Sequence, residues 1–183
     1  EIHMRNTLVH GIIPDELFVK DTLKVIDLSN NLLTGPIPSN IYLPNLEILS
    51  LTDNKLTEDK QRALDERPAW GGCQSELNYP PELNIDLTPG LDGEIPASIG
   101  TLSLLRQLDL SGNNLGGRLP DELIYLYSLD TIYLNDNSTE NAFSTDNAEL
   151  ITKLQSLPDY DLSGVNFIEP LPTDTEVPTP EPL

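Results

Sequence analysis

The sequence is poor in cysteine, aromatic residues and positive charge, and each shortage excludes a class of protein. Its 183 residues hold one cysteine, so no disulfide can form within the chain. Aromatic residues make up 5%, which favours a core of thin aliphatic layers over one built on large rings. Ten Lys and Arg against 30 Asp and Glu give a net charge of −20, which argues against nucleic acids and anionic membrane surfaces as partners. No apolar run approaches the roughly 18 residues of a membrane span.

The residues that usually carry catalysis or bind metals are also scarce. His3 and His10 are the only histidines, and neither has a cysteine or carboxylate at ligand spacing. No nucleophile elbow, phosphate-binding loop or paired-base arrangement is present. We therefore expect no enzyme activity, no cofactor and no metal site.

What the sequence does contain is a repeat. In "LRQLDLSGNNLGGRLPDEL", residues 105–123, Leu108 and Leu110 alternate as in a short strand, and a turn, a second extended piece and a coil or helical return follow. One such unit cannot bury its own apolar side, so it needs neighbours. Similar units recur, with first inward positions at Ile2, Ile26, Leu49, Ile85, Leu108 and Ile132. They stand 23 or 24 residues apart, except for 36 between Leu49 and Ile85.

Three further positions recur in phase with the aliphatic residues. An asparagine ends the strand in four copies, and a glycine-x-aliphatic-proline motif follows in four; the third copy lacks the glycine and the fourth lacks the asparagine. The residues are Asn31, Asn54, Asn113 and Asn137, then Gly11, Gly35, Gly93 and Gly117, then Pro14, Pro38, Pro96 and Pro120. Buried polar groups need partners, glycine suits sharp bends, and proline suits the end of a short strand.

Residues 1–139 resemble the leucine-rich repeat family, most closely its plant-type class, whose unit runs LxxLxxLxLxxNxLxGxIPxxLxx. The resemblance implies an α/β solenoid with a parallel sheet on the concave face, short second strands, and 3-10 or helical returns on the convex side. It also implies buried asparagines that bond turn and neighbouring-repeat backbone. Family members often carry cysteine-paired caps, which this chain lacks. Because residue 1 already lies inside a repeat, we expect an N-terminal cap to be absent.

The repeat pattern divides the chain into five segments. Repeats 1–3 occupy residues 1–58, an irregular insertion 59–82, and repeats 4–6 residues 83–140. A disulfide-free C-terminal cap is predicted over 141–168, with a helix ending before Pro158. An acidic Pro/Thr-rich tail, expected to be an extended linker, fills 169–183.

The insertion has two interpretations. It is either an enlarged convex loop, with Trp70 packed over the core and Cys73 a small buried thiol, or a degenerate internal cap. The pairing state of Cys73 stays open.

The outward side chains of the strands are the candidate ligand-binding residues, because this family binds partners on its concave face. The candidates are His3, Arg5, Asp27, Ser29, Ser50, Thr52, Asp86, Asp109, Ser111, Tyr133 and Asn135. One interpretation is an acidic, hydroxyl-rich face for a basic peptide, a sugar or calcium. The other is that "LDLSxN" is simply the usual sequence of this family at these positions and carries no binding role. His3 and Tyr133 depart from that sequence.

Glycosylation is a second kind of candidate site. Asn137 begins the only N-x-S/T sequon, yet it also occupies the position of a buried repeat asparagine, so the two interpretations exclude each other. Thr173, Thr175 and Thr179 beside prolines are O-glycan candidates if the protein is secreted.

Two functions follow from this pattern. The first is a non-enzymatic extracellular or cell-surface module that recognises a protein or peptide ligand with its concave face. The second is a structural subunit of a matrix or filament, which stacks through uncapped solenoid ends. Self-association through the first strand and the apolar layer of Val9 and Ile13 belongs to the second hypothesis.

Overall fold

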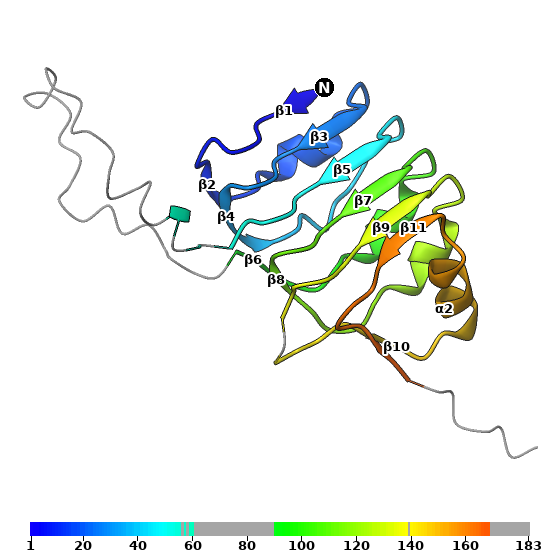
Figure 1. Ribbon diagram of the computed structural model, residues 1–183. Helices are drawn as coiled ribbons and strands as arrows, with labels where there is room; N and C mark the ends of the chain where they lie inside the picture. Colours follow the sequence, from blue (N-terminus) through cyan, green and yellow to red (C-terminus); the bar gives the residue numbers. More distant parts are fainter. Residues whose placement is uncertain (56, 58, 61–89, 139, 169–183) are drawn as a thin grey trace, which may run out of the picture.

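The computed structural model describes residues 1–55, 57, 59–60, 90–138 and 140–168. Six short strands lie side by side in one parallel sheet, and a second row of strands lies beside it (Figure 1). The first sheet holds β1 (Ile2–His3), β3 (Val25–Asp27), β5 (Ile48–Ser50), β7 (Gln107–Asp109), β9 (Thr131–Tyr133) and β11 (Asp159–Asp161), in that order. This confirms the predicted parallel solenoid.

The glycine-proline segments form the second row, as predicted. Its parallel strands are β2 (His10–Ile12), β4 (Leu32–Pro36), β6 (Leu91–Gly93) and β8 (Asn114–Leu115). In three repeats, the proline that ends the motif is followed directly by a 3-10 helix. These helices are η1 (Asp15–Val19), η2 (Ala97–Thr101) and η3 (Asp121–Tyr125). Proline suits this place because its fixed φ continues the extended strand up to the helix start.

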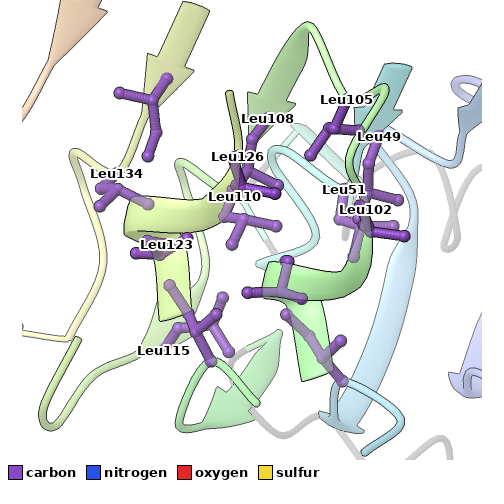
Figure 2. Packing of buried hydrophobic residues seen from close by; sticks show 14 of the residues in the cluster. Leu49, Leu51, Leu102, Leu105, Leu108, Leu110, Leu115, Leu123, Leu126 and Leu134 are labelled. Carbon is purple, nitrogen blue, oxygen red and sulfur yellow. The ribbon is translucent and has the colours of Figure 1, made fainter. Parts of the chain in front are cut away.

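The core is a stack of aliphatic layers between the two rows and the 3-10 helices. Figure 2 shows leucines of neighbouring repeats, among them Leu49, Leu108 and Leu110, pointing into one interior. These three side chains have no exposed surface. Burial of layers like these, at about 25 cal/mol per Å² of apolar surface, is the main stabilising contribution to the fold.

One predicted strand is wrong. We expected a strand near Ile85 between those at Leu49 and Leu108; residue 85 lies outside the described residues, but β5 pairs directly with β7, with Leu49 opposite Leu108. In the second row, Gly35 of β4 pairs with Leu91 of β6. The expected third and fourth copies are therefore two halves of one repeat: the third supplies its strand, and the fourth supplies its glycine and proline.

The two ends of the insertion meet in space. A Cβ built on Gly90 would lie 3.0 Å from the main-chain nitrogen of Lys55. The chain therefore leaves a repeat after Lys55 and rejoins it at Gly90. This geometry explains why the third copy lacks its glycine and the fourth lacks its asparagine.

The C-terminal segment both caps and extends the solenoid. Helix α2 (Ala148–Gln155) is capped by the preceding Asn147, whose side chain accepts hydrogen bonds from the main-chain nitrogens of Glu149 and Leu150. The helix buries Leu150 and Leu154. Strands β10 (Ser144–Thr145) and β12 (Asn166–Phe167) pair beside it. The strand β11, which extends the main sheet from within this segment, was not predicted.

Candidate ligand-binding face

The strand register brings the first column of candidate residues together. His3 stands opposite Asp27, Asp27 opposite Ser50, Ser50 opposite Asp109, and Asp109 opposite Tyr133. Because side chains alternate between faces of a strand, all five project from the face opposite the buried aliphatics. Asp86, which we expected in this column, lies outside the described residues.

The second column is less accessible than the sequence implied. Arg5 is exposed and Thr52 and Asn135 are half-buried, but Ser29 retains only 3% exposure, and Ser50 of the first column 9%. Thr52 and Ser111 share a hydrogen bond between their hydroxyls at 2.8 Å. These hydroxyl groups therefore contribute more to joining neighbouring strands than to contact with solvent.

The recurring Asp-Leu-Ser sequence motif has a local structural role. Oδ1 of Asp27 accepts hydrogen bonds from the nitrogen and hydroxyl of Ser29, at 3.1 and 2.5 Å. Oδ1 of Asp109 accepts the same pair from Ser111, at 3.1 and 2.7 Å. Such bonds stabilise the turn that leaves the strand. In both repeats, one carboxylate oxygen of the aspartate is thus used to stabilise the repeat itself, as the interpretation of this motif as a family feature expects.

Asp109 differs from a carboxylate in open water. Burial raises its pKa above the ordinary value, and the Ser111 hydrogen bonds oppose that shift. A desolvated carboxylate gains more from a nearby cation than an exposed one does, because the local dielectric constant is lower. Asp109 is thus a partly desolvated carboxylate on this face, held by hydrogen bonds from its neighbours.

Two sets of residues on this face were missed. One lies two positions before the first column and consists of Val25, Ile48, Gln107 and Thr131, which are paired across the strands and half-buried. The period-2 alternation would have identified it. The other set is Asp159 and Asp161 of β11; the Tyr133 hydroxyl donates to Asp159. A weak repeat in the cap concealed that strand.

The face is hollowed over its first four strands. A depression of about 330 Å³ is lined by side chains of β1, β3, β5 and β7 and the residues that follow them. Its lining residues are His3, Arg5, Val25, Asp27, Ser29, Ile48, Ser50, Thr52, Gln107 and Asp109. Seven of the predicted candidates thus surround one depression, whereas Ser111, Tyr133 and Asn135 lie outside its lining.

A second feature lies where the insertion begins, at Lys60. The Lys60 ammonium group donates to the main-chain oxygens of Asn31 and Lys55, at 2.9 and 2.8 Å, and to that of Asp53. Burial lowers the pKa of Lys60, while Asp53 opposes that shift. Lys60 attaches the start of the insertion to two neighbouring repeats. No sequence pattern marked it, because its partners are backbone atoms brought together by stacking.

Asn137 occupies the position of a repeat asparagine. Its Nδ2 donates to the main-chain oxygens of Leu110 and Leu134, at 3.0 and 2.9 Å, and its Oδ1 accepts from the nitrogen of Leu115 at 3.2 Å. A glycan on Nδ2 would disrupt these bonds. Its hydrogen bonds are thus those that the burial interpretation expects, but Asn137 is half-buried, whereas Asn31, Asn54 and Asn113 are fully buried. The threonines 173, 175 and 179 lie outside the described residues.

His3 and His10 are not brought together with metal ligands. Within the described ranges, no group of three histidine, cysteine, aspartate or glutamate side chains could hold a metal ion. Among those same residues, no helix has the length and apolar character needed to cross a bilayer.

Comparison with known proteins agrees with this geometry. The Leucine Rich Repeat family model matches residues 22–42 and 104–126. The chain is 31% identical over 152 residues to Receptor-like protein 18 of Arabidopsis thaliana, an alignment that covers 71% of this chain but only 17% of that protein.

Solved structures show the same architecture. The ectodomain of the receptor kinase SOBIR1 from Arabidopsis thaliana matches with a TM-score of 0.63 and 26% identity, over 92% of this chain and 72% of that one. A chain of the BIR3–SERK2 complex from the same plant matches with a TM-score of 0.60 and 25% identity, over 92% and 69%. From its repeats, its stacked parallel strands and these relatives, the chain belongs to the leucine-rich repeat family, in its plant-type class.

Proposed function

We propose that this chain is part of an extracellular recognition module that binds a protein or peptide through its concave face and has no enzymatic activity. The observation that carries the proposal is the depression over β1, β3, β5 and β7. Its lining mixes charged, hydroxyl and aliphatic side chains, and neither Arg5 nor His3 makes a side-chain hydrogen bond across the sheet. An open, mixed surface on a rigid sheet suits recognition.

The relatives support the same proposal. One is named as a receptor-like protein, one solved structure is the ectodomain of a receptor kinase, and another is a complex of two proteins. A cell-surface or extracellular location follows from this resemblance. The chain spans only 17% of this receptor-like relative, so a receptor role for the whole protein is likewise proposed here.

The alternative is a structural subunit that stacks through the ends of the solenoid. Towards the C-terminal end, Leu150 and Leu154 of α2 are fully buried and α2 packs against η3, so the aliphatic layer beneath this helix is covered, although β11 remains the outermost strand of the sheet. Head-to-tail stacking through that layer would require α2 to move. This arrangement favours recognition over stacking.

A pair of tyrosines allows the proposal to be tested. Tyr133 lies on the concave face and Tyr125 lies at the end of η3 on the convex side, with 53% exposure. Each is replaced in turn by a photo-crosslinking phenylalanine analogue, and the folded chain is irradiated with secreted plant proteins and peptides. We expect a discrete adduct from position 133 that excess unlabelled chain suppresses, and none from 125. Adducts from 125 alone, or only homo-oligomeric adducts, would refute concave recognition.

A further inference from the structure

We propose that the groove between η3 and α2, on the convex side of the solenoid, binds a neutral oligosaccharide. The apolar faces of its sugar rings pack against the ring of Tyr127, and its hydroxyls donate to the carboxylate of Glu149. The groove does not belong to the concave face, so this inference goes beyond the proposed function and does not depend on it.

Two neighbouring tyrosines stand where the repeat requires no aromatic residue. Tyr125 and Tyr127 flank the fully buried Leu126, and they keep 53% and 79% of their surface exposed. The main-chain nitrogen of Tyr127 donates to the oxygen of Tyr125 at 2.9 Å. The preceding repeat makes the same turn at the same distance with Thr101 and Ser103, so the turn forms without aromatic side chains. Large apolar groups exposed beyond the needs of the fold indicate an interaction site.

The two rings are held in a fixed arrangement. Their centroids lie 6.5 Å apart and their planes meet at 62°, which is an edge-to-face contact. The ammonium group of Lys153 lies 5.4 Å from the centre of the Tyr127 ring. The same group donates to the main-chain oxygens of Ile124 and Leu126, at 3.0 and 2.8 Å. The segment that carries the tyrosines is thus attached to α2, and a ligand does not have to order it on binding.

A groove lies beside these rings, where α2 packs against η3. Its volume is about 530 Å³, which falls within the range of roughly 300 to 1,000 Å³ that is typical of sites for small ligands. The walls are mainly apolar, with a few polar groups among them. The lining residues are Ile124, Tyr127, Ala148, Glu149, Thr152 and Lys153.

The groove presents a free carboxylate but no free cation. Glu149 is exposed, and in the described part of the chain its carboxylate forms neither an ion pair nor a hydrogen bond. Lys153 lies four residues later on α2, a spacing that allows an ion pair. Its ammonium group is instead used by two main-chain oxygens, and burial lowers its pKa. A ligand with carboxylate or phosphate groups would therefore meet a negative charge without a counter-ion, whereas an uncharged hydroxyl can donate to Glu149.

A neutral sugar matches both the apolar and the polar parts of the groove. Each sugar ring has a face of C–H groups, which loses contact with water when it packs against an aromatic ring. Its hydroxyls can donate to Glu149, and hydrogen bonds to a charged acceptor are about twice as strong as neutral ones. The hydroxyls of Tyr125 and Tyr127, which have no partner among the described residues, can both donate to and accept from the sugar.

An extended peptide fits this groove less well. Peptides that bind in an extended form commonly add a strand to the edge of a sheet. The lining of this groove comes from the end of η3, the residues after it and α2, and it includes no strand. The main-chain oxygens of Ile124 and Leu126 already accept from Lys153. The main chain therefore offers a peptide few partners here.

The test measures binding of neutral oligosaccharides of glucose, xylose and mannose to the folded chain by calorimetry, with oligogalacturonic acid as the charged comparison. We expect a neutral oligosaccharide to bind and oligogalacturonic acid not to bind. Tyr127→Ala should weaken binding by about ten-fold or more, because the packing surface is lost, whereas Tyr127→Phe keeps the ring and should retain most of the affinity. Glu149→Gln should weaken binding several-fold, because a neutral acceptor replaces a charged one.

Tyr42→Ala is the matched control, since Tyr42 is another tyrosine with high exposure, 61%, and does not line the groove. It should leave the affinity unchanged, and circular dichroism checks that every variant is folded. If all the neutral oligosaccharides fail to bind at millimolar concentration, the inference is wrong. Equal weakening by Tyr127→Ala and Tyr42→Ala, or equal binding of oligogalacturonic acid, would also contradict it. These results leave the proposed function intact, because crosslinking at position 133 tests that function separately.

Discussion

The side-chain Nδ2 of Asn113 donates to the main-chain oxygen of Leu51 at 2.9 Å, although 62 residues separate them. In the same position, Asn137 donates to Leu110, only 27 residues earlier. Oδ1 of Asn113 also accepts from the nitrogen of Leu91, at 3.4 Å. One asparagine thus binds both halves of the interrupted repeat and shows that the insertion lies inside it.

This arrangement predicts that the insertion can be removed. Joining Lys55 directly to Leu91 gives the sequence Asn-Lys-Leu-Asp-Gly-Glu-Ile-Pro, an uninterrupted copy of the repeat. Because Gly90 already lies against Lys55, the junction needs little backbone movement. We expect the shortened chain to keep its circular dichroism spectrum and cooperative thermal unfolding. Joining Leu51 to Leu91, which also removes Asn54, is the control and should unfold at a lower temperature; loss of structure in the first variant would contradict a single split repeat.

Asn137 is expected to be unmodified when the chain is secreted from eukaryotic cells. Its amide donates to two main-chain oxygens of adjacent repeats and is not free for a glycan. Mass analysis of the peptide that contains Asn137 checks this, and Thr139→Val, which destroys the sequon, should not change the glycan mass of the chain. Asn137→Ala should cost about 1 to 3 kcal/mol of unfolding free energy, because main-chain partners lose their hydrogen bonds. Hexosamine on Asn137 would show that this turn opens.

The free energy of unfolding should depend on pH through the half-buried carboxylate of Asp109. Burial raises its pKa above the ordinary 3.8, so the folded chain holds this proton more tightly than the unfolded chain. The proton-linked stabilisation is complete below about pH 3.8 and is lost as the pH rises through the folded-state pKa. Asp109→Asn should therefore gain thermal stability relative to the parent chain as the pH rises above about 3.8.

Asp161→Asn is the matched comparison for that experiment. Hydrogen bonds from Ser163 lower the pKa of Asp161, so its contribution is present above the unfolded pKa and is lost as the pH falls through the folded value. The two variants should diverge from the parent chain with opposite pH dependence. Parallel curves would show that the local environments of the two carboxylates do not matter to stability.

Gly116 should be among the least replaceable residues. A Cβ at this position would overlap the main-chain oxygen of Asn141, which also accepts a hydrogen bond from the nitrogen of Gly117 at 2.9 Å. Gly116→Ala is expected to cost about 3 kcal/mol, since a backbone segment must shift. At Gly164, φ is +87° and a Cβ meets nothing within 4 Å, so Gly164→Ala should cost only about 1 kcal/mol of backbone strain. Chemical denaturation of both variants measures the difference.

Much of the concave face could be predicted from the sequence, because strand alternation is local. Period 2 placed His3, Asp27, Ser50, Asp109 and Tyr133 on the outward faces of their strands, the alignment of the repeats placed them in one column, and the strand register joins them. Whether a side chain on this face is exposed and unpaired could not be predicted. Whether Ser29 is buried or Arg5 unpaired depends on neighbouring repeats 20 or more residues away, such as the segment at Asn6 that donates to the main-chain oxygen of Ser29.

The sequence by itself determined the repeat unit, because each unit repeats its own strand, asparagine, glycine and proline within some 24 residues. Only the tertiary structure decided how many units the chain contains. Leu49 and Ile85 look equally like strand starts, and the choice depends on which strand pairs with Leu108. That pairing is a contact between segments 59 residues apart, set by the stacking of layers, and no local pattern records it.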